Sequence, residues 1–175
     1  MNIFILGTGR CGTTTFIKAS QHITNYSAAH ESRSTLIGEP RLDYPEQHIE
    51  ADNRLTWFLG RLDEKYGNAA IYVHLHRDTK ATAHSFAKRE HFGIMSAYRE
   101  GILMGGQEGQ SAYQVACDYI DTVEKNIECF LKDKQHKMQF SLESAQKDFE
   151  IFWKLIGAEG DIDKALAEWN ITYNS

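Results

Sequence analysis

A loop rich in glycine and hydroxyl groups near the start of the chain has the composition of an anion-binding site. Residues 7–15 read Gly-Thr-Gly-Arg-Cys-Gly-Thr-Thr-Thr, after the apolar run Met1–Leu6 and before a helical pattern. In a strand–loop–helix unit the loop N–H groups point inward, and the first helical turn carries roughly half a positive charge. The loop predicts a site for a phosphate-like group, and its candidate ligand-binding residues are Gly9, Arg10, Cys11, Gly12, Thr13, Thr14 and Thr15.

Two phosphate-binding patterns match this loop in part. Gly7, Gly9 and Gly12 satisfy the dinucleotide fingerprint G-x-G-x-x-G, and Glu31 lies 19 residues past the last glycine, near the place of a ribose-binding acid. The P-loop pattern G-x-x-x-x-G-K-[ST] is nearly complete, but Thr13 stands where the lysine should be. A lone G-x-G-x-x-G is a weak signal, so the loop alone leaves both interpretations open, together with an ordinary strand-to-helix turn.

A third pattern places a cation inside the loop. Arg10 lies between the glycines, and Thr13 and Thr14 follow the last of them. A dinucleotide loop spans its pyrophosphate with backbone alone, whereas arginine and hydroxyls suit a ligand with more terminal negative oxygens. In these features the loop resembles the phosphosulfate loop of sulfotransferases, a relative of the P-loop.

A second segment carries another pair of anion-binding side chains. The apolar run Ala69–His76 predicts a buried strand that ends in Arg77, and Ser85 follows eight positions later on a predicted helix, Thr79–Glu90. Ligands of open α/β sheets bind beyond the carboxyl ends of the strands, so the arginine and the serine can converge on one phosphate. The alternative is a surface ion pair between Arg77 and Asp78, with the serine facing solvent.

With both segments in place, the chain resembles the sulfotransferase family. That resemblance implies that Arg77 and Ser85 hold the 3′-phosphate of 3′-phosphoadenosine 5′-phosphosulfate (PAPS), which leaves as 3′-phosphoadenosine 5′-phosphate (PAP). The tyrosylprotein and small bacterial branches are the most similar. In the tyrosylprotein branch the loop cation is arginine, as Arg10 is here, and a catalytic glutamate has the spacing of Glu31. Relatives often carry Lys-x-Pro before the helix that here follows Asp52–Phe58, and Arg54 is the nearest cation to that place.

The resemblance also implies the roles of the catalytic residues. Arg10 and the Thr13–Thr14 hydroxyls and amides would stabilise the oxygens of the transferring sulfuryl group. Glu31 is the first candidate for the base and His30 the second. In an extended segment adjacent side chains point to opposite sides, so only one of these two is expected to face the donor. Arg33 is a candidate partner of Glu31 or of an anionic acceptor.

Metal binding is not expected. His74 and His76 lie two apart on a strand and share a face, but no third ligand is evident, and sulfuryl transfer of this kind needs no metal. Two other functions stay open: a non-catalytic module that binds PAP, and a small P-loop kinase. The acceptor also stays open among small molecules, carbohydrates, lipid headgroups and peptide tyrosine, and the sequence says nothing of the oligomeric state.

Composition indicates one cytoplasmic domain. The chain has 175 residues, 42% of them apolar and 25% charged, which is enough to bury a core. The net charge of −5 argues against nucleic acid or an anionic membrane as a general partner. No apolar run reaches the ~20 residues of a membrane span, and Met1 leads into a strand without a basic leader. The three cysteines are scattered without zinc spacing: Cys11, Cys117 and Cys129.

Strands and helices alternate along the chain, which predicts an α/β fold with three layers, α/β/α, and a central, mostly parallel sheet like that of P-loop NTPases. Three tryptophans fit the apolar core faces of helices, although one could also contact a ligand: Trp57, Trp153 and Trp169. Tyr173 and Asn174 could reach the nucleotide, but the sequence alone does not support that contact. The expected strands span 1–6, 23–29, 69–76 and 138–142, the expected helices 13–22, 55–66, 79–90, part of 91–101, 113–131, 149–156 and 161–169, and 30–49 is expected to be a long loop.

Overall fold

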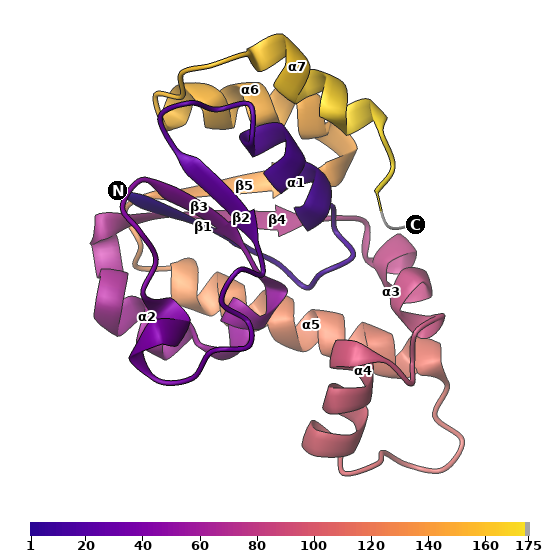
Figure 1. The fold of residues 1–175 in the computed structure, drawn as a ribbon. Helices are drawn as coiled ribbons and strands as arrows, with labels where there is room; N and C mark the ends of the chain where they lie inside the picture. The colour runs from indigo at the N-terminus through magenta and orange to yellow at the C-terminus, as the bar shows by residue number, and fades with distance from the viewer. Residues whose placement is uncertain (174–175) are drawn as a thin grey trace.

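The computed structural model of the chain describes residues 1–173. Within this range, five parallel strands form one sheet in the order β2-β3-β1-β4-β5 (Figure 1). The strands are β1 (Asn2–Leu6), β2 (Ser27–His30), β3 (His48–Ala51), β4 (Ala70–His76) and β5 (Lys137–Ser141).

Helices cover both faces of the sheet, which confirms the predicted three-layer fold. One face carries α1 (Thr13–Ser20), α6 (Ala145–Leu155) and α7 (Ile162–Ala167). The other carries α2 (Leu59–Tyr66) and the long α5 (Ala112–Leu131). Against α5 packs α3 (Thr79–Ala87), and α4 (Gly93–Ala97) follows it, away from the sheet (Figure 1). No helix in this described range is long and apolar enough to cross a membrane.

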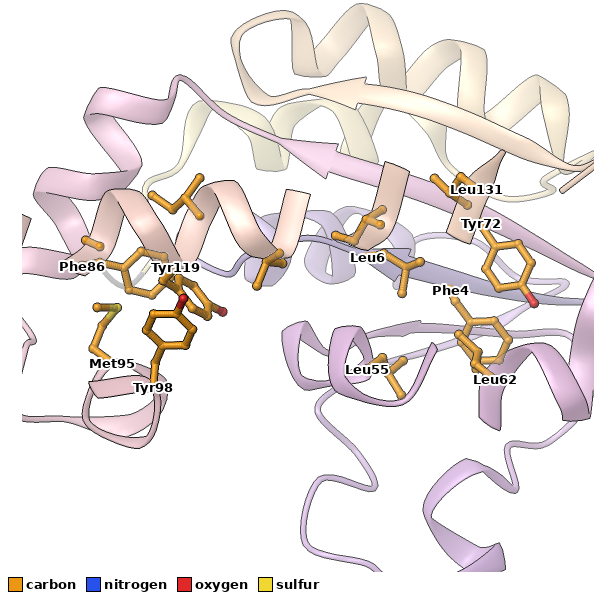
Figure 2. Packing of buried hydrophobic residues seen from close by; sticks show 14 of the residues in the cluster. Phe4, Leu6, Leu55, Leu62, Tyr72, Phe86, Met95, Tyr98, Tyr119 and Leu131 are labelled. Atoms are coloured by element: carbon orange, nitrogen blue, oxygen red, sulfur yellow. The ribbon is translucent and has the colours of Figure 1, made fainter. Parts of the chain in front are cut away.

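The central strand β1 divides the core into two apolar clusters. Because successive side chains of a strand alternate between faces, Ile3 and Ile5 pack beneath α1 and α6. Phe4 and Leu6 face α2 and α5 together with Tyr72 (Figure 2). A parallel sheet buried on both faces reads as a continuous apolar run, which is why β1 and β4 were predictable from the sequence.

One strand was not predicted. The sequence favoured a long loop over 30–49, but β3 begins at His48 and pairs with both β1 and β2. A turn of 3₁₀-helix (Glu39–Leu42) also lies within that stretch. The prediction was wrong because β3 alternates apolar residues with buried polar ones, His48 and Glu50, so its composition is that of a surface loop.

The strand order places the glycine loop at a point where the chain changes direction. After β1 the chain forms β2 and β3 on one side of it and then β4 and β5 on the other, and ligands of open sheets bind at such a point. In the usual dinucleotide-binding order β2 lies next to β1, whereas here β3 separates them. A ribose-binding acid is expected at the end of the strand next to β1. Glu31 follows β2, which is one strand farther out. The strand order disfavours the dinucleotide interpretation.

Candidate functional site

The glycine loop turns sharply between β1 and α1. Gly9, Arg10 and Gly12 have φ angles of 85°, 59° and 99°, in the left-handed region that favours glycine. Gly12 is the N-cap of α1 and brings no side-chain acceptor to the first helical turn. A helix start without a side-chain cap is an environment that stabilises an anion.

Packing explains why two of the loop glycines are glycine. A Cβ at Gly7 would lie 2.5 Å from the carbonyl oxygen of Leu75, at the end of β4. A Cβ at Gly12 would lie 2.7 Å from Cδ1 of Leu142, just after β5. On the α5 side of the sheet, the hydroxyl of Tyr119 donates to the carbonyl of Thr8 at 2.8 Å. The loop is held against three neighbouring elements, so its glycine spacing does not require a dinucleotide.

The two predicted anion-binding segments meet at Arg10. Its Nε donates to the hydroxyl oxygen of Ser85 at 2.9 Å, and Nη1 of Arg77 donates to the Arg10 carbonyl at 3.3 Å. Partial burial lowers the pKa of Arg10, and the charges of Arg89 and Arg77 lower it further. A cluster of arginines around a glycine loop concentrates positive charge in a protein whose net charge is −5.

Two cavities lie on either side of this loop and share Arg10, Thr13 and Thr14. The smaller, of 270 Å³, is completed by Gly12, Thr15, Arg77, Leu142, Trp169 and Ile171–Tyr173. The larger, of 420 Å³, is completed by Gly9, His30, Glu31, Asn53, Arg54, Phe86, Arg89, Phe92, Gly93 and Ile94. Two ligands can therefore approach the same loop from different directions.

Both candidate bases line the larger cavity. β2 ends at His30, and Glu31 has a φ of 51°, so the chain bends there instead of continuing as an extended strand. The condition for the expectation that only one of them faces the donor, an extended segment, therefore does not hold at Glu31, and which of the two faces the donor stays a prediction. Nε2 of His30 lies 3.1 Å from the Thr13 hydroxyl oxygen. Oε1 of Glu31 lies 2.9 Å from Nη1 of Arg54.

Arg54 enters the site from a short 3₁₀-helix, Asn53–Trp57, that follows β3. Its guanidinium reaches the rim of the larger cavity and pairs with Glu31. Arg33 neither pairs with Glu31 nor lines either cavity. Its Nη1 donates to the carbonyl of Pro40 at 2.9 Å, and its guanidinium lies over the ring of Tyr44.

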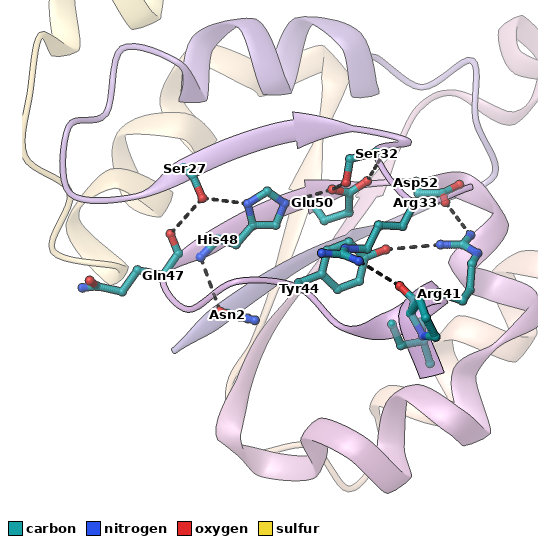
Figure 3. Close-up of polar contacts among 12 residues, drawn as sticks. Asn2, Ser27, Ser32, Arg33, Arg41, Tyr44, Gln47, His48, Glu50 and Asp52 are labelled. Atoms are coloured by element: carbon teal, nitrogen blue, oxygen red, sulfur yellow. Dashed lines mark hydrogen bonds and ion pairs between the residues drawn. The ribbon is translucent and has the colours of Figure 1, made fainter. Parts of the chain in front are cut away.

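A buried polar network on β3 and the residue after it, Asp52 (Figure 3), contacts the segments that carry Glu31 and Arg54. The Glu50 carboxylate accepts hydrogen bonds from the backbone N–H and the hydroxyl of Ser32, the residue after Glu31, at 2.7 and 2.6 Å. Asp52, fully buried, accepts from the backbone N–H of Arg54 at 2.8 Å and from Nη2 of Arg41 at 2.6 Å. Sequence reasoning missed these supporting residues, although the alternation of polar residues at 48, 50 and 52 is a visible signal.

Cys11 takes part in the loop through its backbone alone. Its side chain is fully buried beneath the loop, and burial raises the pKa of the thiol to about 12. Its predicted ligand role is therefore confined to its N–H group.

The two histidines on β4, His74 and His76, contact α5 and each other. Nε2 of His74 lies 2.7 Å from a carboxylate oxygen of Glu124 on α5, and the His74 ring packs against that of His76. Within residues 1–173, no group of three or more histidine, cysteine, aspartate or glutamate side chains could hold a metal ion.

The end of the described chain contributes a wall of the smaller cavity, and it includes two residues that the sequence analysis considered for ligand contact, Trp169 and Tyr173. Trp169 packs against Phe16 and Phe140 in the core and also lines the smaller cavity. Tyr173 lines the same cavity, and its hydroxyl donates to Glu168. Asn174 lies outside the described residues.

Comparison with solved structures shows the fold. A sulfotransferase domain from the curacin biosynthetic pathway is similar over 97% of this chain and 78% of its own, with a TM-score of 0.65 and 13% identical residues. The chain therefore has the sulfotransferase-like α/β fold that its motifs predicted. No family model and no curated protein matches the sequence.

Replacing Asp52 with asparagine should destabilise the protein strongly. The variant leaves the buried Arg41 guanidinium without its counter-charge, and breaking a buried ion pair in this way costs about 3–5 kcal/mol. Urea unfolding measures the change. Asp43→Asn is the matched control, because Asp43 pairs with Lys65 on the surface and its loss should leave the unfolding midpoint nearly unchanged. Equal midpoints for the two variants would contradict a stabilising role of the network.

Cys11 should resist alkylation in the folded protein. With a pKa near 12 its thiol stays protonated at pH 8, and iodoacetamide reacts with the thiolate. The exposed Cys129 should be labelled first, as measured by peptide mass spectrometry, and Cys11 only after urea is added. Equal labelling rates in the native protein would show that the loop does not bury this thiol.

Proposed function

We propose that this protein is a sulfotransferase that transfers a sulfuryl group from PAPS to a hydroxyl or amine of an acceptor. The observation that carries the proposal is the meeting at Arg10 of two segments predicted independently from the sequence. The glycine loop supplies one anion site, and Arg77 with Ser85 supplies another. The sulfotransferase-like fold supports the same function.

The donor would occupy the smaller cavity. Its 5′-phosphosulfate would lie against the loop N–H groups and the start of α1. Its 3′-phosphate would lie against Arg77, which lines this cavity, and would reach Ser85, which does not line it but is hydrogen-bonded to Arg10. The Ser85 hydroxyl oxygen accepts from Arg10, so its own hydrogen can be donated to a phosphate oxygen. The acceptor would approach from the larger cavity, and the shared residues Arg10, Thr13 and Thr14 lie where the two meet.

Transfer would proceed as an in-line displacement at sulfur, in which positioning and charge stabilisation provide most of the catalysis. The acceptor oxygen forms a bond to sulfur as the bond from sulfur to the bridging 5′-phosphate oxygen breaks, and PAP leaves with that electron pair. The acceptor proton passes to the base. Arg10 suits the sulfuryl oxygens because guanidinium stays charged and offers a fork of donors. Removal of one such donor typically costs ~10²–10³ in rate.

We assign the base to Glu31. Its carboxylate lines the acceptor cavity and is fixed by Arg54, which is in turn held by Asp52. His30 lines the same cavity but lies against the Thr13 hydroxyl of the loop, where it helps to orient the donor side. A small kinase is less well supported, because Thr13 occupies the place of the P-loop lysine.

PAP should stabilise the protein more than ATP or NADH. Binding to the folded state raises the free energy of unfolding by about 2.7 kcal/mol when the ligand is at a hundred times its Kd. Thermal unfolding with each nucleotide measures this. Arg77→Gln should abolish the PAP shift, whereas the control Arg61→Gln, a surface arginine on the Gly38 carbonyl, should keep it. A larger shift with ATP or NADH would overturn the proposed donor.

Glu31→Gln should lower the rate of sulfation by about 10²–10⁴-fold, the usual contribution of a general base. The shift in unfolding temperature with PAP should persist, since Glu31 does not line the smaller cavity. Radiolabelled donor and a mixed panel of phenols, sugars and alcohols provide the assay. The control is Glu39→Gln, because Glu39 is exposed at the start of the 3₁₀-helix and lines neither cavity. Full activity of Glu31→Gln together with loss in His30→Gln would transfer the role of base to His30.

A further inference from the structure

The larger cavity contains one more arginine than the proposed transfer uses. Three arginines line it, and its carboxylate, Glu31, is paired with Arg54. Arg10 belongs to the loop and is assigned to the donor. The third, Arg89, is exposed, and no carboxylate of the described residues lies within ion-pair distance of it. The neighbouring Glu90 pairs instead with Arg99 and His91.

Arg89 is positioned to attract an anion into this cavity rather than into the smaller one. It lies near enough to Arg10 for the two positive charges to repel each other, and an anion placed between them would relieve that repulsion. It does not line the smaller cavity, whose arginines are Arg10 and Arg77. In the proposed function the donor phosphates bind at the smaller cavity, so they do not need Arg89.

The wall beside Arg89 is apolar. Phe92 lines the larger cavity and is 74% exposed, which is unusual for a phenylalanine, and Ile94 continues the same wall. An exposed phenyl ring next to a guanidinium is a surface that fits a molecule with one apolar and one anionic part. Glu31 supplies the polar group that such a molecule's hydroxyl would need.

We propose that the acceptor is a hydroxyl compound with an apolar body and an anionic group, in which Arg89 binds the anion and Phe92 contacts the apolar part. This inference rests on the proposed sulfotransferase function and specifies its substrate class. The charge of the group is what Arg89 recognises, so carboxylate, sulfate and phosphate acceptors share this chemistry.

The experiment compares 4-hydroxyphenylacetate with its uncharged amide, 4-hydroxyphenylacetamide, on protein saturated with PAP. Ligand-observed NMR titration should give the acid a Kd at least roughly ten-fold lower than that of the amide, because a hydrogen bond to a charged group is worth about that much or more. Arg89→Gln should remove the difference. The matched control Arg99→Gln, whose arginine pairs with Glu90, should retain it. Phe92→Ser should weaken both ligands alike.

Three outcomes would overturn the inference. The first is equal binding, or no binding, of the two compounds to the wild-type protein. The second is an unchanged preference for the acid in Arg89→Gln. The third is a loss of PAP binding in Arg89→Gln as large as that in Arg77→Gln, which would place Arg89 in the donor site. A preference for the acid that depends on Arg89, in a protein that PAP does not stabilise, would instead uphold this anion site and reject the proposed donor.

Discussion

The hydrogen bond from Arg10 to Ser85 is the contact on which the site depends, because it joins two segments that lie 75 residues apart. The left-handed backbone at Arg10 sends its side chain from the glycine loop toward α3, while Arg77 reaches back to the Arg10 carbonyl. Close packing of the loop against β4 and the end of β5 leaves it little freedom to move. One guanidinium therefore lies at the junction of both cavities.

The second constraint is the polar face of β3. Parallel sheets are usually apolar on both faces, yet His48, Glu50 and Asp52 are buried here. Burial of these groups is costly unless each is hydrogen-bonded. Glu50 bonds to Ser32, the residue after Glu31, and Asp52 bonds to the backbone of Arg54. The strand thus has less apolar packing than a usual buried strand, and its polar residues fix the position of the Glu31–Arg54 ion pair at the larger cavity. This arrangement ties down the loop that carries the candidate base, because Ser32, the residue after Glu31, is hydrogen-bonded to the buried Glu50.

The elements that could be predicted from the sequence are those whose pattern is set by residues close together in the chain. The runs that form β1 and β4, the helix α5 and the tight turn between β1 and α1 all follow from neighbouring residues. β3 did not, because its buried polar residues depend in part on partners farther away in the sequence, such as Ser32 for Glu50. A binding role for Arg89 could not be predicted, because a single arginine outside any motif is a candidate only once the structure places it beside a cavity. The Glu31–Arg54 pair likewise required the two loops to be placed together.

A crystal structure of the protein with PAP bound is the most direct test of the proposed donor site. The 5′-phosphate should lie within ~3.2 Å of backbone N–H groups of residues 9–14, and the 3′-phosphate should be hydrogen-bonded to Arg77 and Ser85. A nucleotide bound away from the loop, or a 3′-phosphate that neither side chain contacts, would contradict the proposed site.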